Sequence, residues 1–161
     1  MHLSKTAPMY LKKLAVLPEW IDYNDHMNLA FYIVAFDQGI DVLYDSLGLG
    51  TDYLNNQNAS TFTLELHVNY LGEVALDDPL DLYARVMDYD HKRMQIYLEM
   101  YHAEKHYLAA TMEQIGMHID MSQRRSAPFP EAILSRIKAT HSDHSTCPEP
   151  VWSGRKISIR K

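Results

Sequence analysis

The sequence is poor in cysteine and has no excess of basic residues. A lone cysteine, Cys147, cannot form an internal disulfide, so nothing requires an oxidising compartment and we expect a cytoplasmic protein. The formal net charge of -6 argues against a nucleic-acid-binding protein, because phosphate binding needs a basic surface.

Long hydrophobic runs are also missing. No apolar run approaches the roughly 20 residues that cross a bilayer, and the first ten residues lack the apolar core of a signal peptide. The sequence contains neither a glycine-rich phosphate loop nor a G-x-S-x-G motif. We therefore expect a soluble protein without a membrane partner and without a serine nucleophile on a strand-to-helix elbow.

The chain of 161 residues, 47% of them hydrophobic, is long enough for one core and too short for two comfortable domains. Residues 9–17 favour a strand that ends at Pro18. From residue 28 to residue 47, apolar side chains beginning with Leu29 recur at spacings of three and four, which predicts an amphipathic helix that Gly48 and Gly50 end.

Four segments with period-two alternation follow, at 61–70, 80–87, 93–101 and 107–119, and each predicts a strand with one buried face. In the first strand, five alternate apolar residues are expected to share that face: Phe62, Leu64, Leu66, Val68 and Tyr70. Residues 130–139 predict a short helix with Pro130 at its start. We assign residues 1–139 to a single domain and residues 140–161 to a polar tail.

This order of elements predicts an α+β fold. One long helix cannot cover both faces of a five-stranded antiparallel sheet, so the economical arrangement wraps the sheet around the helix. The other face of the sheet is then left for solvent or a partner subunit. This is the layout of a hotdog fold.

The polar stretch PEWIDYNDHMN, residues 18–28, lies between the first strand and the long helix. Helix capping explains Asp25 and Asn28, whose side-chain oxygens can accept from free N–H groups of the first turn. Capping does not explain Asp22, which lies between Ile21 and Tyr23, six residues before the helix. A carboxylate among apolar neighbours should have a raised pKa, and near a helix N-terminus it would lie beside free amides. A carboxylate and an oxyanion donor are the groups that acyl transfer requires.

The stretch and the helix after it resemble the catalytic loop of hotdog-fold acyl-CoA thioesterases of the 4-hydroxybenzoyl-CoA thioesterase group. The resemblance implies that Asp22 is the catalytic carboxylate, as nucleophile or as general base. It also implies that the backbone N–H near Leu29 polarises the thioester carbonyl. Asn24, His26 and Asn28 would shape the loop, with His26 as a structural hydrogen-bond partner or a substrate contact.

Residues 18–130 are most similar to the betainyl-CoA thioesterases, which also occur fused to carnitine dehydrogenases. The strings that carry this similarity are the loop, TLELHVNYLGEV, DHKR, LAATMEQIGMHID and APFP. The similarity implies hydrolysis of betainyl-CoA to betaine and CoA, a step in carnitine breakdown. A trimethylammonium group cannot accept or donate a hydrogen bond, so its site needs aromatic faces or a carboxylate. The candidate substrate-binding residues are Trp20, Tyr23, Asn28, Tyr32, Glu65 and Glu113. An interfacial ion pair is the structural alternative for Glu65.

Coenzyme A carries phosphates, which an acidic protein must bind through a local basic patch. The candidates are Lys92 and Arg93 in one turn and Arg124 and Arg125 after the last strand, because arginine binds phosphate in a bidentate manner. Each pair can equally be a solvated turn.

No metal or redox cofactor is expected, and coenzyme A enters only as part of the substrate. His141, His144 and Cys147 lie in the predicted tail without a second cysteine, so we do not assign a zinc site to them. The resemblance implies a homodimer or a tetramer with sites between subunits. The alternatives are a thioesterase for another short-chain or aromatic acyl-CoA, or a non-hydrolytic module that binds acyl-CoA or an acyl carrier.

Overall fold

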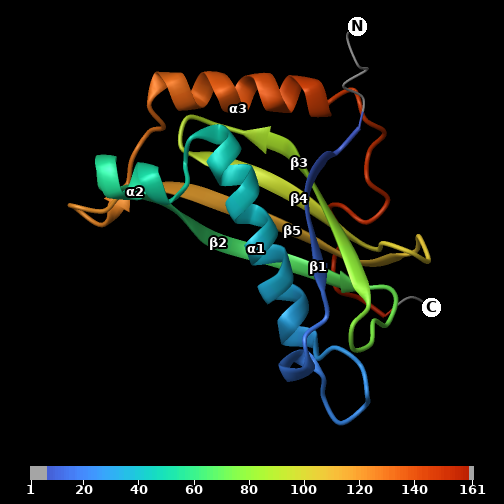
Figure 1. Cartoon of the computed structure of the whole chain (residues 1–161). Coiled ribbons are helices and arrows are strands. Elements are labelled where there is room, and N and C mark those ends of the chain that lie inside the picture. Colours follow the sequence, from blue (N-terminus) through green and yellow to red (C-terminus); the bar gives the residue numbers. More distant parts are fainter. Residues whose placement is uncertain (1–6, 160–161) are drawn as a thin grey trace, which may run out of the picture.

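The computed structural model describes residues 7–159, which form a curled antiparallel sheet with one long helix lying across it (Figure 1). The strand order is β1-β3-β4-β5-β2, and a short strand β6 pairs with β5. The predicted fold is therefore confirmed, with β6 added. The elements are β1 Met9–Ala15, a 3-10 helix at Pro18–Trp20, α1 Leu29–Leu47, α2 Thr51–Gln57, β2 Ala59–Tyr70, β3 Pro79–Tyr89, β4 Arg93–His102, β5 Leu108–Asp120, β6 Arg125–Ser126 and α3 Glu131–His144.

Helix α1 has the ends that the sequence predicts. Asn28 caps it by accepting a hydrogen bond from the N–H of Ala30, and Gly48 ends it with a left-handed φ of 80°. Between these ends, Phe36 and Leu43 are fully buried against the sheet. Leu29 was expected on the buried stripe but is 62% exposed, because it begins the helix beyond the edge of the core.

Strand β2 differs from its prediction. The pairing of β2 with β5 shifts register between Thr63 and Glu65, which is a β-bulge that leaves Leu64 without a partner. Side chains before and after a bulge are out of phase, so the five alternate apolar residues do not share one face. β2 is also an edge strand, and Phe62 and Leu66 are about 40% exposed as a result.

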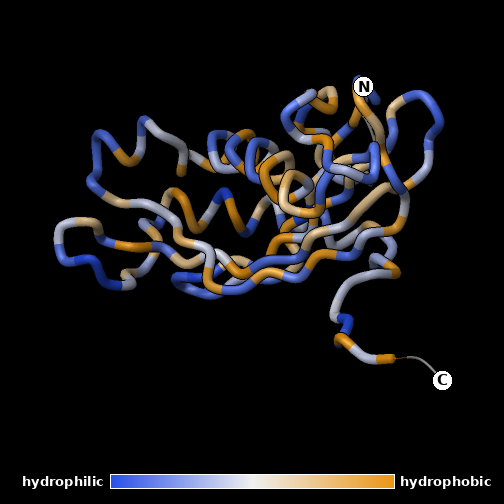
Figure 2. Tube along the Cα trace, turned by 90° about the horizontal axis from the view of Figure 1, so that it is seen from below, coloured by the Kyte–Doolittle hydropathy of each residue, from blue (hydrophilic) through white to orange (hydrophobic). Residues whose placement is uncertain are grey.

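The segment predicted as a polar tail is partly ordered against the sheet. Helix α3 continues past residue 139 to His144 and buries Ile133 and Ile137 beside β3. Seen from below, α1 lies on one side of the sheet and the C-terminal end on the other (Figure 2). There the N–H of Gly154 donates to Glu113. The division between domain and tail remains a prediction, and its boundary falls within α3.

Because His144 is held in its neutral form, we expect stability to fall in mild acid. Its Nδ1 accepts the backbone N–H of Val86 at 2.9 Å, and burial lowers the pKa of His144 below its usual 6.5. A lowered folded-state pKa means that this contribution is complete above pH 6.5 and is lost as the pH falls below it. The measurement is urea unfolding at pH 7.5 and pH 5.5 for the wild type and for His144→Leu.

In His144→Leu the buried N–H of Val86 loses its acceptor. The free energy of unfolding at pH 7.5 should drop by about 1–3 kcal/mol, and its further drop at pH 5.5 should be smaller than in the wild type. His91→Gln, which alters an exposed histidine, is the control and should behave as the wild type. Equal pH dependence in wild type and His144→Leu would contradict the assignment.

Candidate active site

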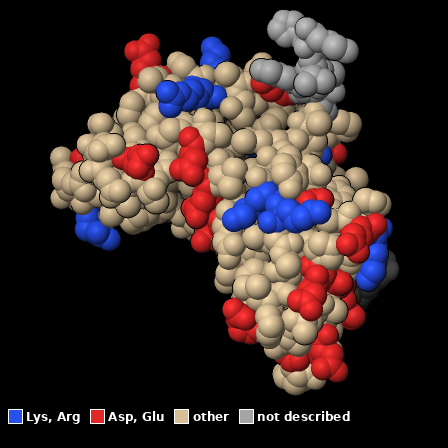
Figure 3. All heavy atoms as spheres, viewed as in Figure 1, with Lys and Arg blue, Asp and Glu red and all other residues tan. Residues whose placement is uncertain are grey.

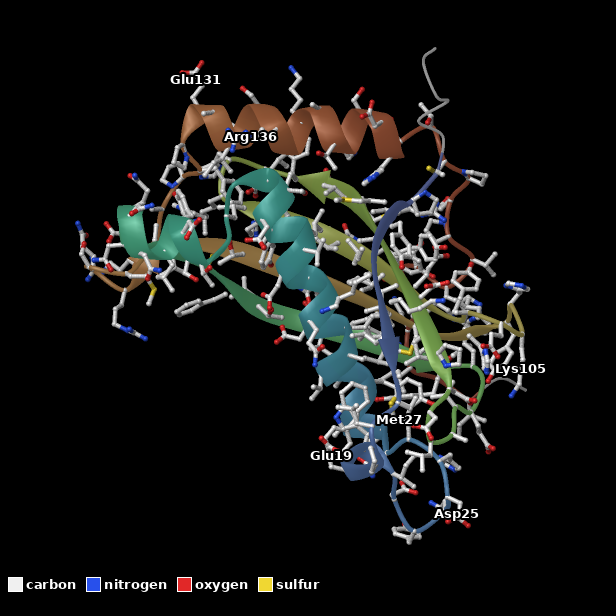
Figure 4. The ribbon with its side chains drawn as sticks, in the orientation of Figure 1. Glu19, Asp25, Met27, Lys105, Glu131 and Arg136 are labelled. Carbon is white, nitrogen blue, oxygen red and sulfur yellow. The ribbon has the colours of Figure 1, made fainter. Side chains whose placement is uncertain are left out.

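The loop before α1 is a compact turn rather than an open connection. An isolated bridge joins Ile21 to Met27, and the N–H of Asp22 donates to the carbonyl of His26 within the loop. Asp25 adopts a left-handed φ of 62°, a conformation that Asp tolerates and Gly favours. Figure 4 shows Asp25 at the tip of the loop and Met27 nearer the body of the protein. The N–H of Met27 donates to the carbonyl of Val74 at 2.8 Å, which ties the loop to the segment after β2.

Asp22 lies near the N-terminus of α1, and hydrogen bonds stabilise its ionised carboxylate. Its Oδ1 accepts the backbone N–H of Asn24 at 2.8 Å, and its Oδ2 accepts the side-chain amide of the N-cap Asn28 at 3.2 Å. The Asn24 N–H above all, and the Asn28 amide to a lesser degree, lower the pKa of Asp22 below its usual 3.8. The expectation of a raised pKa was wrong, because donors surround this carboxylate where apolar side chains were assumed. The carboxylate of Asp22 is therefore ionised at neutral pH.

The N–H of Leu29 is the free donor at this helix end. The N–H of Ala30 is used by the Asn28 side chain, and the N–H of Phe31 donates to the Asn28 carbonyl at 3.0 Å. Leu29 is the first helical residue and so has no intrahelical acceptor, and no loop acceptor within residues 7–159 engages it. The predicted oxyanion donor is thus available, at the positive end of the helix dipole.

These groups line an open cavity of about 460 Å³. The loop, the first turn of α1 and the end of β2 with the residues after it form its walls. Seven predicted site residues are brought together here: Asp22, Tyr23, Asn24, His26, Asn28, Leu29 and Tyr32. The wall also contains five residues that sequence reasoning did not assign to the site: Met27, Tyr70, Leu71, Gly72 and Glu73.

Tyr70 is the most informative of the added residues. Its hydroxyl donates to the carbonyl of Leu29 at 3.0 Å, and its ring meets the ring of Tyr32 edge to face at 5.1 Å. Gly72 lies two residues after Tyr70. A larger residue would not fit there, because a Cβ would approach the ring of Tyr107 to 2.8 Å. A glycine directly after the strand, in YLGE, was the feature of the sequence that could have indicated a close approach.

His26 lies at the rim of the cavity. Its Nδ1 is 3.4 Å from the carbonyl of Met27, and its Nε2 is 3.9 Å from the carboxylate of Glu73. Both interpretations of His26, structural partner and substrate contact, agree with this position.

Three of the predicted substrate-binding residues lie elsewhere. Trp20 is buried, stacks on Phe31 and does not line the cavity, because the 3-10 helix turns it into the core. Glu65 and Glu113 line a separate cavity farther along β2 and β5. The carboxylate of Glu113 already accepts hydrogen bonds from Gln95 and Gly154. Within one chain, these three residues do not form a substrate site with Asp22.

The predicted CoA-binding residues lie at the opposite end of the sheet from Asp22. Tyr70 in the cavity wall pairs with Ala110 at the start of β5, whereas Arg125 pairs with Asp120 at its end, roughly 30 Å away at about 3.3 Å per residue. Lys92, Arg93 and Arg124 belong to the same distant end, where Arg93 forms an ion pair with Asp90. One chain cannot bring these basic residues to its own Asp22.

Within residues 7–159, no three His, Cys, Asp or Glu side chains are grouped so that they could hold a metal ion. None of the described helices is long and apolar enough to span a membrane.

The chain matches a family model described as the thioesterase-like superfamily over residues 16–137. It is 35% identical to a betainyl-CoA thioesterase of Pseudomonas aeruginosa over 144 residues, covering 89% of this chain and 91% of the relative. It is 28% identical to an L-carnitine dehydrogenase/betainyl-CoA thioesterase of a Rhizobium species, covering 99% of this chain but only 32% of that longer protein.

A Staphylococcus aureus protein solved in complex with CoA has a similar structure, with a TM-score of 0.88 and 32% sequence identity. The alignment covers 95% of this chain and 97% of that one.

Proposed function

Because this chain belongs to the thioesterase-like superfamily, we propose that it is a thioester hydrolase that cleaves a small acyl-CoA to the free acid and coenzyme A. The observation that carries the proposal is that one open cavity holds both an ionised Asp22 and the N–H of Leu29, which has no acceptor among residues 7–159. A module that only binds acyl-CoA needs no carboxylate there.

Two routes use the same groups. In the first, a carboxylate oxygen of Asp22 attacks the thioester carbon, the C–S bond breaks, and CoA leaves as its thiolate. Water then hydrolyses the resulting mixed anhydride and regenerates Asp22. In the second, Asp22 takes a proton from a water molecule that attacks the carbon itself, the C–S bond of the tetrahedral intermediate then breaks, and CoA leaves as its thiolate, which takes up the proton from Asp22. In both, the Leu29 N–H stabilises the negative oxygen of the tetrahedral intermediate, while Asn24 and Asn28 orient the carboxylate.

We propose betainyl-CoA as the substrate, with betaine and coenzyme A as products. The P. aeruginosa relative of nearly equal length carries that activity in its name, and the fused relatives name a carnitine dehydrogenase beside it. The reaction would then be a step in carnitine breakdown, in the cytoplasm. It needs no resident cofactor, because Asp22 and Leu29 supply both the nucleophile or base and the oxyanion donor.

The two edges of the sheet support a homodimer formed through strand β2. Edge strand β1 carries Lys12 and Lys13, which discourage pairing with another strand. Edge strand β2 contains no lysine or arginine and exposes Phe62, Leu64 and Leu66. An edge that exposes apolar side chains and has no lysine or arginine favours a second copy, and two such dimers could associate into a tetramer.

Antiparallel pairing of β2 with β2 of a second copy would also supply the phosphate site. Such pairing reverses the two sheets end to end, so the distant basic end of the partner would lie beside the cavity of this chain. The basic residues that cannot reach Asp22 in their own subunit would then contact the bound CoA in the other. These basic residues are Lys92, Arg93, Arg124 and Arg125. Glu65 of the partner subunit would also lie closer to the cavity of this chain than its own Glu65 does.

A panel of acyl-CoA thioesters tests the function. We expect the purified protein to release thiol from betainyl-CoA faster than from acetyl-, butyryl- or benzoyl-CoA, as followed with a thiol reagent. A faster rate on one of the others would move the substrate assignment to that acyl group. Binding of these thioesters by calorimetry, with no thiol released from any of them, would leave only the binding module.

A further inference from the structure

Tyr70 is a fixed aromatic wall beside the reacting carbonyl. Its hydroxyl donates to the carbonyl of Leu29, the residue whose N–H receives the thioester oxygen, and its ring packs perpendicular to the ring of the buried Tyr32. The side chain is nevertheless 47% exposed, so part of the ring is open to the cavity that it lines.

The cavity carries negative charge and no fixed positive charge. Its wall contains the carboxylates of Asp22 and Glu73 but no lysine or arginine, and His26 is its one other titratable side chain besides tyrosines. The carboxylate of Glu73 is 82% exposed and 3.9 Å from His26. On the face shown in Figure 3, acidic side chains gather on the lower lobe that the loop forms. An anionic acyl chain would be repelled here, whereas a cationic one would be attracted.

We propose that Tyr70 and Glu73 form the acyl subsite for a quaternary ammonium group and set the preference of this enzyme for cationic acyl-CoA substrates. The inference rests on the proposed thioesterase function and adds the residues that select the substrate. In a betainyl thioester, one methylene separates the ammonium nitrogen from the thioester carbonyl carbon. A carbonyl oxygen on the Leu29 N–H therefore keeps the ammonium group near the N-terminus of α1, in the cavity that Tyr70 and Glu73 line. Tyr70 supplies the π face and Glu73 the counter-charge.

The test compares betainyl-CoA with 3,3-dimethylbutanoyl-CoA, in which a carbon replaces the charged nitrogen at almost the same shape. The charge preference is the ratio of kcat/KM for the two thioesters. In the wild type it should be about five- to thirty-fold in favour of betainyl-CoA. Tyr70→Leu and Glu73→Gln should each lower that ratio several-fold through the cationic substrate, with the rate on the neutral one changed much less.

Two matched variants serve as controls. Tyr70→Phe keeps the aromatic face and should keep the charge preference. Glu19→Gln removes an exposed carboxylate on the 3-10 helix outside the cavity and should leave the ratio unchanged. The ratio of the dissociation constants of the two thioesters is also measured by calorimetry in the Asp22→Asn background, where the thioesters stay intact.

The outcomes separate this inference from the proposed function. If the wild type hydrolyses both thioesters and the ratio is the same in Tyr70→Leu and Glu73→Gln, the subsite is wrong and the hydrolase stands. If no thioester is hydrolysed but the binding ratio falls in both variants, the subsite stands and the hydrolase is wrong. If neither thioester is bound, both proposals are overturned.

Discussion

Replacing Asp22 with Asn is expected to lower kcat/KM for the acyl-CoA substrate by about 10²–10⁴-fold, the usual range for loss of a catalytic acid or base. Asn has nearly the same shape, but it can neither attack the thioester carbon nor take a proton from water. The loop should persist, because the amide oxygen of Asn can still accept the N–H of Asn24 that Asp22 accepts at 2.8 Å. The measurement is thiol release at substrate concentrations well below KM.

Asp25→Asn is the matched control, since it makes the same chemical change three residues along the same loop. Asp25 lies at the tip with φ of 62°, a conformation that Asn adopts readily. It should therefore retain nearly full activity and an unchanged melting temperature. Comparable losses in both variants would mean that the loop, and not the Asp22 carboxylate, determines the rate.

The acid side of the pH–rate profile gives a second measure of Asp22. The reaction needs the ionised carboxylate, and the N–H of Asn24 lowers the pKa of Asp22 below 3.8. Activity should consequently persist as the pH falls, and the acid limb of kcat/KM should lie below pH 3.8 unless unfolding intervenes. An acid limb well above pH 3.8 in a protein that remains folded would contradict the assignment to Asp22.

The fold could be predicted from the sequence because its elements have strong and distinct periods. The spacing in α1 and the alternation in β3, β4 and β5 leave little choice of structure. In β2, a bulge at Leu64 in the middle of the strand reversed the face of the later residues. A bulge adds one residue to one strand and leaves no mark in composition, so alternation alone could not reveal it.

The site was predictable only where it is local. Asp22, Asn28 and Leu29 are neighbours in the sequence, and the requirements of a helix N-terminus place them together. Tyr70 and Glu73 reach the same cavity through contacts between distant segments, because the Tyr70 hydroxyl donates to the Leu29 carbonyl and the N–H of Met27 donates to the carbonyl of Val74. The prediction that Trp20 lines the site was wrong although Trp20 is close to Asp22 in the sequence. Closeness in sequence does not determine which way the 3-10 helix turns a side chain.

A lysine in the middle of the exposed edge should separate the proposed dimer. Leu66 lies on β2 and is 41% exposed in the single chain, so pairing with a second β2 would bury it. Leu66→Lys would place an unpaired charge in that interface, which is strongly unfavourable. We expect the variant to sediment as a monomer at micromolar concentration where the wild type is a dimer. Leu76→Lys, at a residue of similar exposure in the connection after β2, should remain dimeric.

Activity decides whether the dimer only stabilises the fold or also completes the site. Arg124 and Arg125 lie too far from Asp22 in their own chain to bind its substrate, so a monomer would hold the acyl group but not the phosphates. The KM for the acyl-CoA should then rise at least ten-fold in Leu66→Lys, because losing one charge-assisted phosphate contact removes about 1.5–3 kcal/mol. A substrate truncated to acyl-pantetheine, without the nucleotide phosphates, should show a much smaller difference. If the monomer binds full-length acyl-CoA as tightly as the dimer does, the phosphate site must lie within one subunit.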